Sequence, residues 1–246
     1  MDQTERQKEI LSFIFSGECT NVKDLSRHIY ASPATIRRDL HCLEEAELIR
    51  LSYGNIIPLT KEPTGPWAFR INEAKNAKRK IAKYAAEMIP ANSTVILDAS
   101  SSALYIAEYL SPNLNLTVFT NCMKTAIQLC EHNITIYYIG GKVVNRNFVT
   151  TGSWAEEAVA SINADYFFFS SKNLGYDGLI TAESEDGARM RKLMIKHSAN
   201  QFFLCNAEKI GRKSTFALCS ASDITGVISD ADLSAIPNIN AIHVPG

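Results

Sequence analysis

The nine residues from Ser32 to Leu40, SPATIRRDL, constrain this chain more than any other stretch. Ser32 can cap a helix, because its hydroxyl oxygen accepts a backbone N–H of the first turn, and Pro33 suits the first helical position. Ile36 and Leu40 follow at helical spacing, so they face a core. Three polar side chains are left on the outward side near the start of the helix: Thr35, Arg37 and Arg38. That is the end of a recognition helix that meets base edges and phosphates.

Apolar spacing predicts two more helices before this one. The first runs from Thr4 to Phe15, and the second runs from Val22 to Ile29 with Thr20 or Asn21 as its cap. Tyr30-Ala31 is then a tight connection to the third helix. This spacing is typical of a helix-turn-helix.

Residues 48–57 predict a small hairpin, or wing, with its turn at Gly54-Asn55, where a positive φ is cheap. Three helices and a wing make a winged helix-turn-helix. We expect its DNA-contacting residues to be Ser32, Thr35, Arg37, Arg38, Tyr53 and Asn55. Phosphate contacts carry much of DNA affinity, and acids such as Glu44 and Glu45 offset the arginines. We therefore expect useful affinity from paired units.

The segment resembles the DeoR family of bacterial transcription regulators. The residues that carry the resemblance are Ser32, the run from Thr35 to Leu40, Leu43-Glu44 and Gly54. The wing departs from the family pattern, with Glu47 and Asn55 at positions where the family has glycine and Leu51 where it often has a basic residue. These departures place more of the expected DNA contact on the helix.

Composition excludes several other classes of protein. With 246 residues, 46% of them hydrophobic, and a net charge of −1, the chain can bury two cores. No run of about 18 apolar residues exists and the N-terminus is polar, so we expect no membrane span, no secretory signal and a cytoplasmic protein. The six cysteines and five histidines are scattered. We interpret the cysteines as reduced core thiols and expect no metal and no cofactor.

Prolines and a glycine mark a linker over residues 58–74. This divides the chain into a DNA-binding domain, 1–57, and a sensor domain, 75–246. A long helix is predicted from Lys75 to Ile89, with a basic start formed by Lys75, Lys78, Arg79 and Lys80. That basic start fits either a contact to DNA phosphates or a solvated helix face.

Short apolar strands alternate with helices after residue 93, which predicts an α/β domain. The expected strands are 94–98, 116–120, 134–139, 165–169 and 201–205. Such alternation favours a mostly parallel sheet covered on both faces. Sheets of this kind bind ligands beyond the carboxyl ends of their strands.

The predicted strand ends are rich in hydroxyls, glycines and lysines. The candidate effector-binding residues there are Asp98, Ser100, Ser101, Ser102, Thr120, Asn121, Gly140, Gly141, Lys142, Lys172 and Lys209. Hydroxyls, close-approaching backbone and point charges suit a phosphorylated polyol or sugar, with Asp98 either binding sugar hydroxyls or orienting its loop. Taken singly, each loop has a plainer interpretation: Ser100 could only cap a helix, and Gly140-Gly141 could only form a turn.

The family resemblance extends to this half. DeoR sensor domains look like the fold of ribose-5-phosphate isomerase and the CoA transferases, and their motifs match here at Asp98, Ser101, Ser102, Thr120-Asn121, Gly140-Gly141, Lys209 and Gly211. Ser100, Asn206 and Glu208 depart from those motifs. The resemblance implies a repressor of a carbohydrate-use operon, released from double-stranded operator DNA by a phosphorylated sugar. It also implies a homo-oligomer, dimer or tetramer.

Two alternatives remain open at this point. One is a sugar-phosphate isomerase fused to a DNA-binding unit, with Glu183, Glu185 or Asp186 as its base, although a polar run before a helix more often forms a cap. The other is a regulator whose altered loops bind no effector.

Overall fold

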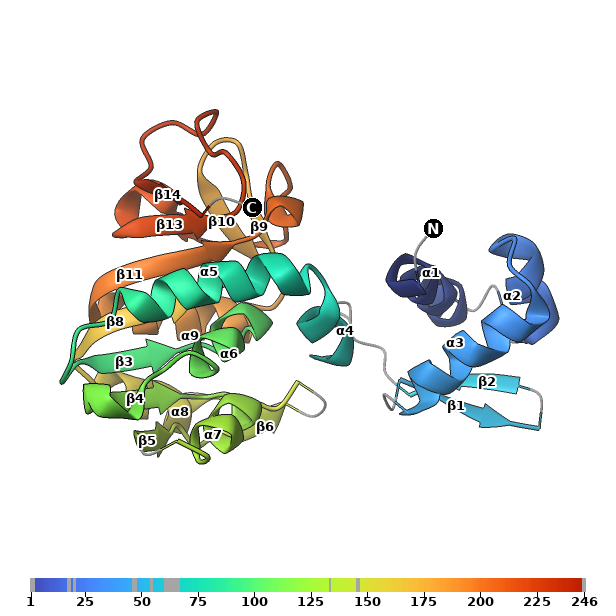
Figure 1. Cartoon of the computed structure of the whole chain (residues 1–246), viewed down its shortest axis with the longest axis horizontal. Coiled ribbons are helices and arrows are strands. Elements are labelled where there is room, and N and C mark those ends of the chain that lie inside the picture. The colour runs from blue at the N-terminus through green and yellow to red at the C-terminus, as the bar shows by residue number, and fades with distance from the viewer. Residues whose placement is uncertain are drawn as a thin grey trace. The chain divides into compact units, whose positions relative to one another are not determined.

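A computed structural model describes residues 3–16, 19, 21–45, 48–53, 55–59, 67–132, 134–144 and 147–244. Internal contacts divide the chain into two compact units, Met1–Glu73 and Ala74–Gly246. We call them the N-terminal unit and the C-terminal unit, and each is described by itself (Figure 1).

The N-terminal unit is a winged helix-turn-helix, as predicted. Its elements are α1 (Gln3–Ser16), α2 (Val22–His28), α3 (Pro33–Glu45), β1 (Ile49–Ser52) and β2 (Asn55–Pro58), followed by α4 (Trp67–Asn72). Asn21 is the cap of α2, and its side-chain oxygen accepts the Asp24 N–H at 3.0 Å. The buried core gathers one apolar face from each of α1, α2 and α3 and closes under the wing. The expected linker therefore contains a short helix, and Pro63, Gly65 and Pro66 lie outside the described residues.

The turn of the wing lies one residue earlier than predicted. Ser52 pairs with Asn55, which makes Asn55 the first residue of β2. The turn therefore begins at Tyr53, whose φ is +48°. Asn before or after Gly is the usual signal for such a turn, but the pairing register sets the turn here. Gly54 itself lies outside the described residues.

The C-terminal unit is built on a seven-stranded sheet in the order β14-β13-β11-β8-β3-β4-β5, and every pairing in it is parallel. Its strands are β3 (Thr94–Leu97), β4 (Thr117–Thr120), β5 (Thr135–Tyr138), β8 (Ala164–Phe169), β11 (Ser198–Cys205), β13 (Gly226–Ser229) and β14 (Ala241–His243). The five predicted strands are all present. The parallel sheet is therefore confirmed, with β13 and β14 added at one edge.

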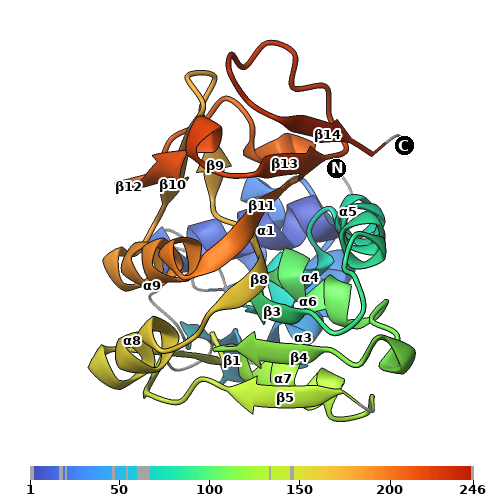
Figure 2. The ribbon, with the colours of Figure 1, turned by 90° about the vertical axis from the view of Figure 1, so that its left-hand side faces the viewer.

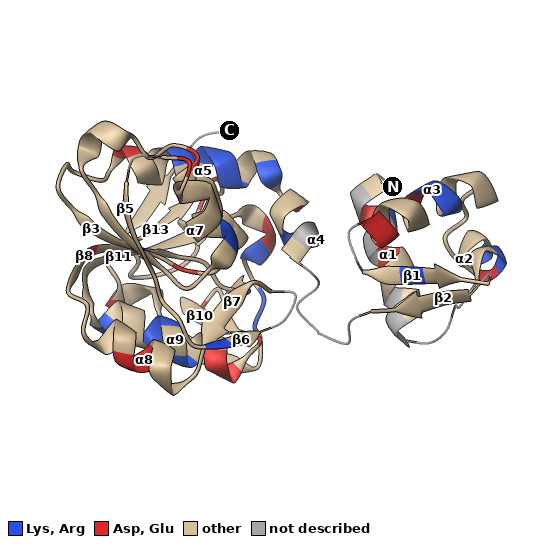
Figure 3. Ribbon diagram, turned by 90° about the horizontal axis from the view of Figure 1, so that it is seen from below, with Lys and Arg blue, Asp and Glu red and all other residues tan. Residues whose placement is uncertain are grey.

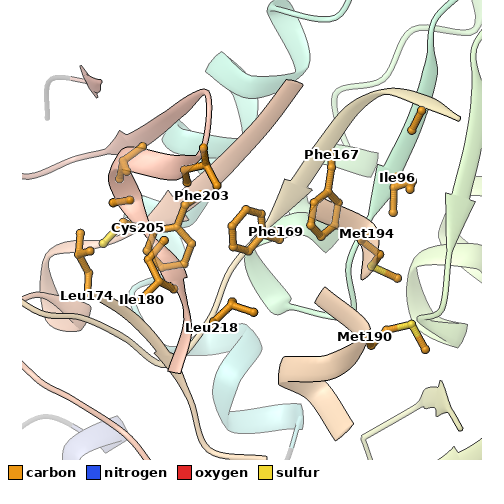
Figure 4. Packing of buried hydrophobic residues seen from close by; sticks show 14 of the residues in the cluster. Ile96, Phe167, Phe169, Leu174, Ile180, Met190, Met194, Phe203, Cys205 and Leu218 are labelled. Carbon is orange, nitrogen blue, oxygen red and sulfur yellow. The ribbon is translucent and has the colours of Figure 1, made fainter. Parts of the chain in front are cut away.

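Helices cover both faces of this sheet (Figure 2). One layer contains α5 (Lys75–Glu87), α6 (Ser101–Ala107) and α7 (Met123–Leu129), and the other contains α8 (Ser153–Ala160) and α9 (Glu185–Lys196). Phe167 and Phe169 of β8 belong to the core cluster that includes residues of α8 and α9, and their ring centroids are 4.9 Å apart (Figure 4). Phe168 points to the opposite face of the sheet, because successive strand residues alternate, and it is also fully buried since helices cover both faces.

Two small antiparallel sheets complete the unit. One pairs β6 (Lys142–Val144) with β7 (Val149–Thr151), and the other has the order β12-β10-β9, formed by Phe216–Ser220, Leu179–Ala182 and Asn173–Leu174. The sequence analysis did not predict either sheet. Among the helices that the structure describes, none is long and apolar enough to cross a membrane.

Candidate functional site

The N-terminal end of α3 is built by its cap, as predicted. Ser32 Oγ accepts the Thr35 backbone N–H at 3.1 Å and lies 2.8 Å from Thr35 Oγ1. Ile36 and Leu40 are buried beneath it. The cap therefore holds two hydroxyl groups at the start of a helix whose opposite face is fixed in the core.

Arg37 and Arg38 lie exposed on this helix, and neither forms an ion pair with any acid in the described ranges. Figure 3 shows a basic segment of α3 in blue. The next residue behaves differently: Asp39 is wholly buried, and its carboxylate accepts from Arg6 Nε at 2.5 Å and Arg6 Nη2 at 3.3 Å. A two-point bond of this kind fixes orientation as well as distance. The buried pair anchors α3 to α1 and leaves the two arginines turned outward.

The wing is tied to the same helix. Glu44 Oε1 accepts the Leu51 N–H at 2.7 Å, so Glu44, one of the acids expected to offset the arginines, holds β1 in place. A groove runs between the start of α2, the outer face of α3 and the wing, lined by Val22, Arg37, Leu40, His41, Leu51, Asn55 and Ile56. Arg37 and Asn55, two of the predicted DNA contacts, therefore share one surface. Tyr53 is completely exposed two residues before Asn55.

In the C-terminal unit, the predicted loops follow the carboxyl ends of adjacent parallel strands. Asp98, at the end of β3, is 1% exposed, and its carboxylate accepts three bonds. They come from Arg191 Nε at 2.7 Å, Ser100 N at 3.0 Å and Ser170 N at 3.4 Å. Of the two roles expected for Asp98, these contacts serve the second, because they hold the loop in place.

The hydroxyls after Asp98 are also engaged. Ser100 Oγ caps α6 by accepting the Ala103 N–H at 3.1 Å, and Ser101 Oγ accepts from Lys78 Nζ at 3.1 Å. Lys78 is 3% exposed, so the prediction that it lies on a solvated or DNA-facing surface is wrong. The sequence placed Lys78 among four basic residues at a helix start, but its position in α5 turns it inward to the strand-end loop.

At the end of β4, Thr120 Oγ1 accepts the Cys122 N–H at 3.1 Å, and Asn121 Nδ2 donates to Thr150 O at 2.9 Å. Gly140 and Gly141 follow β5. Gly141 has a φ of +146°, and a Cβ there would lie 2.7 Å from the Thr151 carbonyl oxygen. This glycine is required by the close approach of β7, whereas Gly140 has open space around it.

The three predicted lysines differ in environment. Lys209 Nζ donates to the Ser171 carbonyl oxygen at 2.6 Å and is half-buried, whereas Lys172 is exposed and lies 3.2 Å from Glu183 Oε1. Lys142 is exposed at the start of β6. Of these three lysines, only Lys209 bonds a strand-end loop from a half-buried position.

Several buried polar atoms near these strand ends lack a hydrogen-bond partner among the described residues: Asn121 Oδ1, Thr151 Oγ1, Glu183 Oε2 and Asn206 Oδ1. A buried polar atom without a partner costs free energy and calls for an explanation such as water or a bound ligand. Asn206 was not predicted as an effector-binding residue, and Glu183 was named only as a possible base in the enzyme alternative. Lys78 and Arg191 were not predicted as partners of the strand-end loops. The Lys78–Ser101 and Arg191–Asp98 contacts span 23 and 93 residues of sequence, so no local pattern could have predicted them.

The cysteines form no disulfide. Burial is the main cause that raises the pKa of the Cys205 thiol to about 12, so this thiol stays protonated at neutral pH. Within the described ranges, no cluster of three or more His, Cys, Asp or Glu side chains could hold a metal ion.

Comparison with known protein families matches both units. A model of the DeoR-like helix-turn-helix domain matches residues 6–61, and a model of the DeoR C-terminal sensor domain matches residues 73–231.

Curated relatives match along nearly the whole chain. The HTH-type transcriptional regulator GlpR of Haloferax volcanii is 30% identical over 94% of this chain and 91% of its own length. The HTH-type transcriptional repressor GlcR of Bacillus subtilis is 30% identical over 94% and 89% of the two chains. The glycerol-3-phosphate regulon repressor of Escherichia coli is 26% identical over 94% and 92%.

Among solved structures, ribose 5-phosphate isomerase A of Methanocaldococcus jannaschii is 12% identical, with a TM-score of 0.41 over 55% of this chain and 54% of that one. A likeness this weak supports no conclusion about chemistry.

Proposed function

This chain belongs to the DeoR family of helix-turn-helix transcriptional regulators, and on that premise we propose that it is an operator-binding repressor that a phosphorylated sugar or polyol releases. Its DNA contacts are made by α3 and the wing, and its effector binds at the carboxyl edge of the parallel sheet. The protein acts in the cytoplasm as a homo-oligomer and not as an enzyme.

One observation carries the DNA-binding half of the proposal. Arg37 and Arg38 are exposed at the first turns of a capped helix, directly beside a buried Asp39–Arg6 pair that fixes the helix. Guanidinium groups presented in this way pair with phosphate oxygens and with guanine edges in the major groove. Ser32 and Thr35 add hydroxyls at the same end, and Tyr53 and Asn55 add wing contacts.

The proposed effector site is supported by three basic side chains that bond the strand-end loops. Lys78 bonds Ser101, Arg191 bonds Asp98, and Lys209 bonds the Ser171 carbonyl. Buried oxygens of Asn121, Thr151 and Asn206 lie on strand-end segments without partners among the described residues, and they suit the hydroxyls of a polyol. Relatives named for a glycerol-3-phosphate regulon fit this chemistry. The proposed effector set also includes three buried hydroxyl residues, two glycines and two exposed lysines: Ser100, Ser102, Thr120, Gly140, Gly141, Lys142 and Lys172.

The test begins with the purified full chain and a random duplex library, from which binding sequences are selected. The selected duplex is then titrated by fluorescence anisotropy with and without glycerol 3-phosphate and with hexose and pentose phosphates. Each phosphorylated compound has its unphosphorylated counterpart as a matched control. We expect selected DNA to bind at least 10³-fold more tightly than random DNA and one phosphorylated compound to weaken binding about 5- to 150-fold.

Three results would contradict the proposal. Failure of the selection to enrich any DNA sequence would contradict operator binding. Enrichment followed by identical affinity with every phosphorylated compound would remove the effector response and favour a regulator that has lost its ligand. Turnover of any of the phosphorylated compounds would favour the enzyme alternative.

A further inference from the structure

Tyr30 combines a strained backbone conformation with an exposed side chain. It joins α2 to α3 in the left-handed backbone conformation, with a φ of +54°, and its side chain is 96% exposed. A bulky residue at positive φ costs free energy that glycine avoids. Packing of the ring against the protein would offset this cost, but the Tyr30 ring is exposed and is not packed.

The surrounding contacts force this conformation on residue 30. Ile29 before it is buried, and its N–H donates to the Leu25 carbonyl at 2.9 Å. Ala31 after it packs against the core of the N-terminal unit, and its carbonyl accepts from Ser26 Oγ at 2.5 Å. The chain must reverse between two anchored neighbours, so the side chain at position 30 points outward. Any residue here has the same geometry, and glycine is the residue that fits it best.

The other aromatic residues at positive φ in the described ranges sharpen the contrast. The ring of Phe148 is covered by Lys124, whose Nζ lies 4.4 Å from the ring centroid, so Phe148 is explained by packing. Tyr53, at the turn of the wing, is as exposed as Tyr30. Two strained, exposed tyrosines therefore flank α3, one in the turn before its cap and one in the wing that bonds its Glu44.

The location of Tyr30 indicates what it binds. It lies two residues before Ser32, whose hydroxyl caps the helix that carries Arg37 and Arg38. A surface that presents guanidinium groups faces a polyanion, and the phenol O–H is a neutral donor that bonds a phosphate oxygen without adding charge. Backbone strain at exposed positions persists where function uses the side chain.

We propose that Tyr30 is a DNA-backbone contact whose hydroxyl donates to a phosphate of the duplex beside α3. This inference rests on the proposed function, since it requires that α3 face DNA. It adds a sequence-independent contact from the turn between α2 and α3, at a position where the fold itself would be served better by glycine.

The contact has a distinctive signature because it is neutral. Loss of an arginine–phosphate contact lowers affinity and reduces the slope of log K against log salt by about one per bound unit. Loss of a tyrosine hydroxyl lowers affinity and leaves the slope unchanged. Removal of the whole side chain in Tyr30→Gly also relieves the positive φ, so stability and DNA affinity move in opposite directions.

The experiment uses the full chain and a mixed-sequence 30-base-pair duplex at several salt concentrations. The variants are Tyr30→Phe and Tyr30→Gly, with Tyr176→Phe as the exposed-tyrosine control from the C-terminal unit and Arg38→Ala as the charged comparison. We expect Tyr30→Phe and Tyr30→Gly to bind roughly tenfold more weakly with the wild-type salt slope, which is the loss of one hydrogen bond to a charged group. The Tm of Tyr30→Gly should equal or exceed the wild-type Tm, and Tyr176→Phe should change neither quantity.

Three outcomes would count against the account, and they are distinguishable. Wild-type affinity in both Tyr30 variants, with weaker binding by Arg38→Ala, would overturn the inference and leave the proposed function standing. A reduced salt slope in Tyr30→Phe would overturn the neutral contact. If the wild-type chain did not bind the duplex at low salt, the proposed function itself would be contradicted.

Discussion

The two units place their polar residues in opposite ways. In the N-terminal unit, the residues predicted to bind a ligand point outward, and a different residue, the buried Asp39, holds them there. In the C-terminal unit, the predicted residues are mostly buried. They bond the backbone or basic side chains that were not predicted, as Asp98, Ser101 and Lys209 do. A surface for a large, rigid polyanion needs exposed groups, whereas a pocket for a small molecule needs groups fixed inside a fold.

This difference has a consequence for mutagenesis. Substitutions on the outer face of α3 should alter binding and leave stability unchanged. Substitutions in the strand-end loops should alter stability first, since each side chain there also supports its neighbours.

Asp98→Ala should be the most disruptive change. It removes the acceptor of three bonds and leaves Arg191, whose side chain is 17% exposed, without its carboxylate. Breaking a largely buried ion pair in this way costs about 3–5 kcal/mol. Urea unfolding monitored by tryptophan fluorescence and circular dichroism measures the loss. Asp98→Asn, which keeps part of the hydrogen bonding, should lose less, and a loss under about 1 kcal/mol in Asp98→Ala would refute a supporting role.

Gly141→Ala should be the next largest. The new Cβ would meet the Thr151 carbonyl oxygen at 2.7 Å in a backbone with a φ of +146°. We expect a loss of about 1–3 kcal/mol in the free energy of unfolding. The adjacent Gly140→Ala is the matched control, because nothing lies within 4 Å of its Cβ. Equal losses in the two variants would show that the close approach of β7 does not restrict residue 141.

Ser32 offers a smaller effect that separates stability from binding. Ser32→Ala removes the cap of α3 and should cost about 1 kcal/mol. Ser32→Asp keeps a capping oxygen, so its unfolding free energy should stay near that of the wild type while its carboxylate repels phosphates and weakens duplex binding. Thermal unfolding and anisotropy titration give the two quantities. A Ser32→Asp variant that bound DNA as tightly as the wild type would place this end of α3 away from DNA.

Local signals explain what was predictable. Ser32, Pro33 and the spacing of Ile36 and Leu40 define α3 within nine residues, so its cap and its buried face were predicted. The parallel strands were predictable for the same reason, because each is a short apolar run. Their shared carboxyl edge then followed from topology alone.

The features that were missed depend on distant partners or on register. Lys78 was assigned to a surface because nothing near it in sequence reveals Ser101, 23 residues away. Arg191 lies 93 residues from Asp98, so no local pattern predicts that the two side chains pair. The Gly-Asn pair predicts a wing turn one residue too late, because the turn is set by strand pairing, which joins Ser52 to Asn55.

The central claim is that exposed guanidinium groups on α3 bind DNA phosphates and base edges. The most direct test is the salt dependence of duplex binding by the wild-type chain and the Arg37→Ala/Arg38→Ala double variant, with unfolding free energies measured in parallel. We predict a large loss of affinity and a decrease of about two in the slope of log K against log salt per bound unit if both contacts are to phosphates, or about one if one arginine reads a base. Stability should change by less than about 0.5 kcal/mol. Unchanged affinity and slope in a folded double variant would contradict the account.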